Sequence, residues 1–150
     1  DDIATGIGRV SGAVVAVNGT NEESELVSGV IAHMRKSAID LTGVMSLSGL
    51  CGLTERAAMV ISNDSGPLHL ALAIGTPCVG VYWLTNLMEA CPLRQHTHRA
   101  AMSVRVHCPV CGQENRRTRC EHDVCFVDDV PVDHVTAMAL ELFESTVARA

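Results

Sequence analysis

Short apolar segments alternate with longer amphipathic ones along the first 82 residues of the chain. The apolar segments are four or five residues long, which suits buried strands, whereas the amphipathic ones carry apolar positions at helical spacing. In residues 22–36, for example, glutamates occupy the first turn and Arg35 and Lys36 the last, as the helix dipole favours. The pattern predicts strands at 13–17, 38–41, 59–62 and 78–82, and helices at 22–36, 47–57 and from residue 65 onward.

This alternation predicts an α/β fold, a parallel sheet with flanking helices. Composition agrees, because 47% of the residues are hydrophobic and only 3% are aromatic, which leaves the core to aliphatic side chains. Residues 83–128 break the alternation, and we expect them to form an irregular section rich in cysteine and histidine. A C-terminal helix is predicted at 131–149, so we expect one domain over residues 1–150.

The turn between the third predicted strand and the helix that follows has the character of a phosphate-binding site. A helix that opens directly after a strand presents free N–H groups and the positive end of its dipole at one point. The free N–H groups of Ser65, Gly66 and Leu68 would bind phosphate oxygens without a metal, and His69, one turn into the helix, could donate a further hydrogen bond. Asp64 is an unfavourable neighbour for an anion, so we expect it to cap the helix or to bind a sugar hydroxyl and not to contact phosphate. The alternative is a plain capped helix, with Asp64 as the N-cap and His69 as a surface residue.

Charge and cysteine content narrow the classes of partner and compartment. The net charge of −6 argues against nucleic acid or an anionic membrane as the main partner. The sequence has no apolar segment long enough to span a bilayer and begins with no signal-peptide pattern. With seven cysteines, an odd number, we expect reduced thiols and a cytoplasmic location.

Four of the cysteines lie close together in the section after residue 83. Cys108 and Cys111 have the spacing of a zinc knuckle, and Cys120 and Cys125 follow them. His107 and His122 are spare ligands in the same segment. The cluster suits a structural zinc ion, and the alternative is free thiols or oxidisable pairs.

Several motifs, in their order and spacing, resemble glycosyltransferase family 9, the family typified by the ADP-heptose:lipopolysaccharide heptosyltransferases. They lie at residues 14–22, 40–43, 46–47, 63–69 and 75–77, and the Asn-Asp-Ser-Gly-Pro-x-His run followed by Gly-Thr-Pro is the most specific of them. The resemblance implies a Rossmann-like domain, the C-terminal, donor-binding half of a GT-B enzyme. It also implies that the chain begins after the first strand of that domain, where the family usually carries a basic residue near the diphosphate.

The resemblance assigns further residues to the donor. It implies that Glu22, beside Asn21, bonds the ribose hydroxyls, and that Met45 lines the base pocket. The alternatives are that Glu22 only complements a helix dipole and that Met45 is a core residue. We expect the loops after residues 17, 41 and 62 to lie on one sheet edge, arranged for ribose, base and diphosphate.

The function implied is donor binding in an inverting, metal-independent heptosyltransferase of cell-envelope glycan synthesis, with an ADP-heptose-like nucleotide sugar as the ligand. The resemblance assigns the general base to an N-terminal domain, so catalytic residues are not identified here. We expect the chain to be inactive alone and to pair with such a half or with a second copy. The alternative is a non-catalytic nucleotide-binding or interaction module that kept the fold. An NAD-type domain ranks low, because no Gly-x-Gly-x-x-Gly follows a strand.

Overall fold

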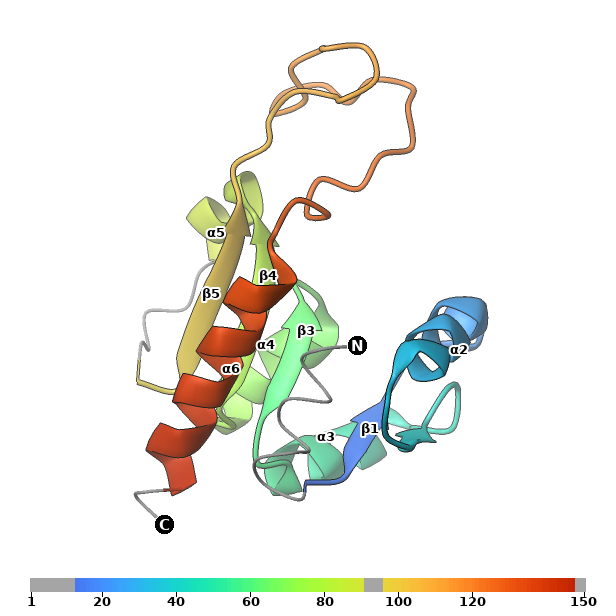
Figure 1. Ribbon diagram of the computed structural model, residues 1–150, viewed down its shortest axis with the longest axis vertical. Helices are drawn as coiled ribbons and strands as arrows, with labels where there is room; N and C mark the ends of the chain where they lie inside the picture. Colours follow the sequence, from blue (N-terminus) through green and yellow to red (C-terminus); the bar gives the residue numbers. More distant parts are fainter. Residues whose placement is uncertain (1–12, 91–95, 148–150) are drawn as a thin grey trace.

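A computed structural model describes residues 13–90 and 96–147 of the chain (Figure 1). The predicted lead-in at 1–12 and the last two residues of the predicted helix at 131–149 lie outside the described residues. None of the helices in the described part combines the length and the apolar character needed to cross a lipid bilayer.

The N-terminal part is a βαβ unit with a two-stranded sheet. Strand β1 (Val15–Val17) leads through a 3₁₀ turn, η1 (Asn21–Glu23), into α2 (Ser24–His33), and the chain returns as β2 (Ala38–Asp40). The strands β1 and β2 pair in parallel over all three residues. Within residues 13–46, Val27 on α2 is the only fully buried side chain. This unit therefore has very little core of its own.

The second part is a three-stranded parallel sheet in the order β3-β4-β5. Helix α3 (Leu47–Arg56) precedes β3 (Val60–Asn63), and α4 (Gly66–Ile74) connects it to β4 (Cys78–Trp83). Strand β5 (His98–Ser103) completes the sheet. These elements begin and end within two residues of the predicted ones, apart from β5, which was not predicted.

Helices cover both faces of this second sheet. Helix α6 (Val132–Val147) packs on one face and α4 on the other, as Figure 1 shows. Alternate β4 residues point to opposite sides, so Val79 packs with Ala139 and Leu142 of α6, whereas Tyr82 packs with Leu68 of α4. The hydrophobic core lies in these two layers, and the class predicted from the sequence, α/β with parallel strands and flanking helices, is confirmed.

The strands do not form the one continuous sheet that the sequence suggested. Strands β1 and β2 make one sheet and β3, β4 and β5 another. A doubly wound fold has six strands in the order 3-2-1-4-5-6. In that order, β2 and β1 would take positions 3 and 2, and β3, β4 and β5 would take positions 4, 5 and 6. Position 1, which would pair with both β1 and β3, is not filled by any strand in the described residues. Within residues 13–90 and 96–147, the loops predicted to share one sheet edge therefore follow strands of two separate sheets.

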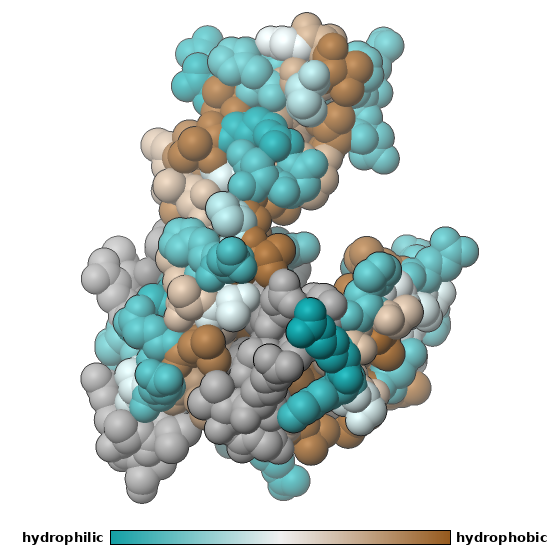
Figure 2. All heavy atoms as spheres, in the orientation of Figure 1, coloured by the Kyte–Doolittle hydropathy of each residue, from teal (hydrophilic) through white to brown (hydrophobic). Residues whose placement is uncertain are grey.

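Residues 83–128 are more regular than predicted. Helix α5 (Leu84–Ala90) follows β4 directly, and β5 adds six residues to the sheet within this range. The prediction of an irregular section is wrong for these two elements, because β5 begins with His98 and Arg99 and then has two alanines, which carry little strand signal. The same prediction holds for residues 104–131, which contain no helix or strand of the sheet and project beyond it. Hydrophilic side chains cover a large part of their surface in Figure 2.

Helix α3 links the two parts of the molecule. It packs against α4, and the hydroxyl of Thr76 donates a buried hydrogen bond of 2.8 Å to the carbonyl of Thr54 on α3. Ser46 caps this helix by accepting the N–H of Gly49 at 3.1 Å. The loops that follow β1 and β2 are thus attached to the second sheet through α3.

Candidate functional site

The turn at residues 63–69 lies between the end of β3 and the start of α4. The N–H of Asp64 donates to the carbonyl of Val81 at 3.0 Å, which attaches the turn to β4. Ser65 is the N-cap of α4 in an extended conformation, but its hydroxyl donates to the carbonyl of Asn63 at 3.1 Å and makes no capping bond. The orphan N–H groups at the start of α4 therefore have no side-chain acceptor of the usual kind.

Two of the three predicted N–H donors are available. Leu68 and His69 both donate to the carbonyl of Ser65, at 3.1 and 3.2 Å, so Leu68 is already engaged, which differs from the prediction. Pro67 has no N–H. No hydrogen bond from the N–H of Ser65 or Gly66 is formed within the described part of the chain. These two unbonded N–H groups lie at the positive end of the α4 dipole, where Ser65 is half-buried and Gly66 exposed.

Asp64 does not cap α4. One carboxylate oxygen, Oδ2, accepts a hydrogen bond of 2.8 Å from the side-chain amide of Asn86 on α5. The other, Oδ1, lies 3.1 Å from Nε2 of His69 and is buried, although the geometry falls short of a hydrogen bond. The Asp64 side chain is only 13% exposed, whereas that of His69 is 50% exposed. The carboxylate is thus held by two neighbours, and an imidazole edge remains open to a ligand.

The loops after β1 and β2 are joined to each other. The N–H of Gly43 donates to the carbonyl of Gly19 at 2.9 Å, and Gly43 has a φ of +65°. A Cβ atom on Gly43 would lie 1.8 Å from Oδ1 of Asn21, so the Asn21 side chain rests directly on this glycine. The structure therefore brings together Asn21 and the loop that carries Met45, two of the predicted ligand-binding positions.

Glu22 and its neighbour Glu23 have different environments. Oε2 of Glu23 accepts hydrogen bonds from the N–H and the hydroxyl of Thr20, at 2.7 and 2.9 Å, and these bonds lower the pKa of the Glu23 carboxyl. Glu23 is therefore the residue that supports the helix start. Glu22 is exposed, and its side chain makes no hydrogen bond or ion pair within the described residues. Its carboxylate is open to a ligand.

Met45 is half-buried at the start of α3. Its Cε atom lies 3.3 Å from the position that a Cβ on Gly49 would take, so the side chain covers the first turn of the helix. It is an apolar surface next to the Gly43 loop.

The cysteine-rich segment brings together a metal-ligand set. One ligand atom from each of Cys108, Cys111, Cys120 and His122 lies within 4.8 Å of the others. Backbone N–H groups, first that of Cys111 and then that of Val110, hold the pKa of the Cys108 thiol below its ordinary value. The arrangement can hold a metal ion. Three of the four predicted ligands are in it, and His122 rather than Cys125 is the fourth.

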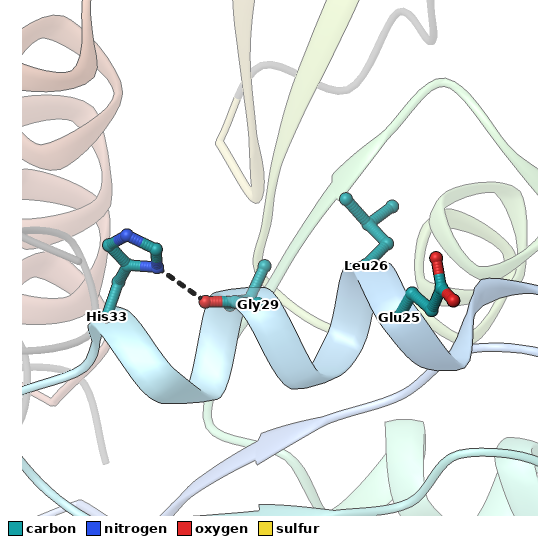
Figure 3. Close-up of a pocket in the computed structure, with 5 residues that line it drawn as sticks. Glu25, Leu26, Gly29 and His33 are labelled. Atoms are coloured by element: carbon teal, nitrogen blue, oxygen red, sulfur yellow. Dashed lines mark hydrogen bonds between the residues drawn. The ribbon is translucent and has the colours of Figure 1, made fainter.

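A shallow depression on α2 lies apart from these groups. It is lined by Glu25, Leu26, Gly29, Val30 and His33 (Figure 3). All five residues come from one helix, and Nδ1 of His33 is bonded to the Gly29 carbonyl at 2.7 Å. A single helix face cannot enclose a ligand, so we assign no site there.

Comparison with known proteins identifies the family. The model of glycosyltransferase family 9 (heptosyltransferase) matches residues 8–120. The chain belongs to this family. The family 9 match includes the turn at 63–69, the loops after β1 and β2, and three of the four clustered metal ligands, but not His122.

Curated relatives agree with the family 9 assignment, and a solved structure agrees with the fold. The lipopolysaccharide core heptosyltransferase OpsX of Haemophilus influenzae is 33% identical over 70 residues, which are 47% of this chain and 20% of that protein. Lipooligosaccharide heptosyltransferase 2 of the same organism is 27% identical over 86 residues, which are 55% of this chain and 25% of that protein. A family 9 glycosyltransferase from Veillonella parvula matches with a TM-score of 0.73 and 24% identity, over 95% of this chain and 40% of that one. The chain thus spans a quarter or less of the curated relatives and less than half of the solved one.

One residue of the candidate site is not predicted from the sequence. Asn86 holds Asp64 from α5, which was itself not predicted. No local signal marks this asparagine, because its role depends on α5 turning back beside the β3–α4 turn.

Proposed function

We propose that this chain binds the diphosphate of a nucleotide-sugar donor at the turn between β3 and α4. The observation that carries the proposal is the pair of open N–H groups of Ser65 and Gly66 at the N-terminus of α4. Phosphate oxygens are acceptors that match such donors, and the helix dipole favours their charge. This binding needs no metal ion.

The environment of Asp64 supports an anion at this position. A carboxylate beside a diphosphate would repel it, but Asp64 is turned toward Asn86 and His69 and is largely buried. His69 lies beside this carboxylate and its side chain is 50% exposed, so its open edge can donate to a phosphate oxygen. In a transfer reaction the same donors would stabilise the leaving diphosphate as charge develops on it.

The loops after β1 and β2 would hold the nucleoside. Glu22 is free to accept both ribose hydroxyls, since Glu23 supports the helix start. Asn21 and Met45 border the same joined loops and would contact the ribose and the base. Both sheets carry these loops at the carboxyl ends of their strands, the usual ligand edge of α/β proteins.

We infer that the donor is an ADP-heptose-like sugar nucleotide and that the complete enzyme is an inverting heptosyltransferase of lipopolysaccharide core synthesis in the cytoplasm. The names of the two Haemophilus relatives support this substrate class. The acceptor and the general base would come from the rest of such an enzyme, a separate half or a second copy. The isolated chain is therefore expected to bind nucleotide weakly and to transfer little or no sugar.

Titration of the chain with ADP and with an ADP-sugar by calorimetry tests the proposal. Gly66→Ala is the informative variant, because a Cβ at this position meets no atom within 4 Å and leaves the fold intact, yet it stands where the diphosphate would approach. We expect roughly tenfold weaker ADP binding, about 1.4 kcal/mol. Gly29→Ala, which is also free of contacts, is the matched control and should bind as the parent does.

A second variant separates ribose from phosphate recognition. Glu22→Gln should weaken ADP binding and leave inorganic pyrophosphate binding unchanged, whereas Glu25→Gln should change neither. If ADP and ADP-sugar fail to bind at millimolar concentration, the donor-binding proposal is wrong and a non-catalytic interaction module is favoured. Multiple-turnover transfer by the isolated chain would contradict the expected inactivity.

A further inference from the structure

The segment after β5 carries a second site that donor binding does not use. We propose that Cys108, Cys111, Cys120 and His122 bind one structural zinc ion, with His122 and not Cys125 as the fourth ligand. The four ligand atoms lie within 4.8 Å of one another. A tetrahedral zinc with Zn–S bonds of about 2.3 Å has sulfur–sulfur separations of about 3.8 Å, so small side-chain rotations close the set around an ion.

A short hairpin presents the first two ligands. Residues 107 and 114 form an antiparallel bridge, and the N–H of Cys108 donates to the carbonyl of Gln113 at 2.9 Å. At the tip, Gly112 has a φ of +74° and its N–H donates to the Cys108 carbonyl at 2.9 Å. The positive φ favours glycine at this position. The tight turn places both thiols of the Cys-x-x-Cys pair on one side.

The backbone of this hairpin is arranged to receive a thiolate. The N–H of Val110 donates to Sγ of Cys108 at 3.4 Å. Zinc binds cysteine as the thiolate, and an N–H donor stabilises that charged form. Cys108 is also buried, at 2% exposure, as a packed core cysteine would be. A neutral thiol, however, gains little from an N–H donor directed at its sulfur. The contact fits a ligand role better than a packing role.

A buried asparagine holds the third ligand in place. Asn115 is 3% exposed, its Oδ1 accepts the N–H of Cys120 at 2.8 Å, and its Nδ2 donates to the carbonyl of Gln113 at 2.7 Å. One side chain thus ties Cys120 to the hairpin that carries the other two cysteines. These two hydrogen bonds fix Cys120 relative to the hairpin, which lowers the cost of ordering the site.

The four metal ligands favour zinc over other metal ions. Three thiolates and one imidazole suit zinc, and no carboxylate belongs to the group that would favour magnesium or calcium. All four protein positions are filled, which is the pattern of a structural site with no place for substrate. Cys111 and His122 are exposed, so the ion can enter from solvent.

The segment needs such a support, because it has little hydrophobic core. Among residues 104–131, only Cys108, Asn115 and Phe126 are buried. Its contact with the sheet is at its base, where the Phe126 ring lies 4.9 Å from that of Trp83 and the indole N–H of Trp83 donates to the Arg105 carbonyl at 2.6 Å. The projecting tip carries the cysteine hairpin instead (Figure 1). Zinc would hold the tip as these contacts hold the base.

Metal content and ligand identity test the proposal directly. The chain, purified under reducing conditions and loaded with zinc, should contain one zinc per molecule by mass spectrometry of the metal. X-ray absorption should give three sulfur ligands and one nitrogen. Cobalt loading should produce the thiolate charge-transfer and tetrahedral bands. Failure to retain either metal would overturn the proposal, as would a four-sulfur shell.

Cys125→Ser and Cys120→Ser are a matched pair of variants. Cys125→Ser should bind zinc as the parent does, whereas Cys120→Ser should bind it at least a hundredfold more weakly. His122→Ala should weaken binding roughly tenfold or more and remove nitrogen from the metal shell. If Cys125→Ser loses zinc while His122→Ala keeps it, the assigned ligand set is wrong.

Hydrogen exchange gives a readout that does not depend on these variants. Removal of zinc with a chelator should speed exchange of amides in residues 104–131 and leave those of α4 and β4 unchanged. ADP binding should also persist, since the zinc site is separate from the β3–α4 turn. Unchanged exchange in residues 104–131 would contradict a structural role.

Discussion

Gly43 illustrates how a single residue positions the candidate nucleoside loops. Its φ of +65° and the contact of Asn21 at 1.8 Å from any Cβ both require glycine. We expect Gly43→Ala to lower the free energy of unfolding by about 2 kcal/mol. Urea denaturation measures this change. Gly52→Ala, in the interior of α3 with no contact to a Cβ, should instead be neutral or stabilising by up to about 1 kcal/mol, and an equal loss in both variants would contradict the explanation.

His98 makes stability depend on pH. It is 5% exposed, its Nε2 lies 3.2 Å from the Tyr82 hydroxyl, and burial followed by the charge of Arg99 lowers its pKa. The unfolded chain then binds a proton more tightly than the folded one. We expect the free energy of unfolding to be unaffected by His98 well above pH 6.5, and to fall as pH is lowered through about 6.5 and below.

Urea denaturation of His98→Gln between pH 8 and pH 5 measures this contribution. The variant should lose part of the pH dependence, at most about 1.4 kcal/mol per pH unit. His96→Gln, at an exposed position, should keep the parent's dependence. Identical pH curves for the parent and His98→Gln would contradict the assignment.

At the scale of elements, two helices begin with serine but use it differently. Ser46 caps α3 through the Gly49 N–H, whereas the Ser65 hydroxyl bonds backward to Asn63 and leaves the start of α4 open. We expect Ser46→Ala to lower the free energy of unfolding by about 1 kcal/mol, and Ser65→Ala by less than about 0.5 kcal/mol. Urea denaturation of both variants tests this difference, and equal losses would mean that Ser65 also acts as a cap.

The predictability of the elements follows their local signals. Helices α3 and α4 have a cap or proline at the start and strong periodicity, so the sequence predicts their bounds closely. Strand β5 has no such signal, because its residues form a strand only where β4 offers an edge for pairing. Most candidate site residues were likewise identified by motif, whereas Asn86 depends on the packing of α5 and was missed.

At the scale of the whole molecule, the two sheets differ in burial. Strand β4 is central in its sheet and covered by helices on both faces, whereas Val27 of α2 is the only fully buried side chain within residues 13–46, which contain β1 and β2. We expect native-state hydrogen exchange to give a higher opening free energy for Val79 and Val81 than for Val15 and Val17. Equal protection of the two strands would show that the sheets unfold as one unit.

The sequence by itself determined the parallel α/β class, most element bounds, the turn between β3 and α4 and the cysteine cluster, because each depends on spacing between residues near in the chain. Only the tertiary structure decided that the strands form two sheets, that Asp64 turns toward His69 and Asn86, and that His122 joins the three cysteines. These outcomes depend on which segments meet in space. The pairing of strand edges, the burial of a residue and the direction of its side chain depend on contacts with residues distant in the chain, which a local sequence pattern does not include.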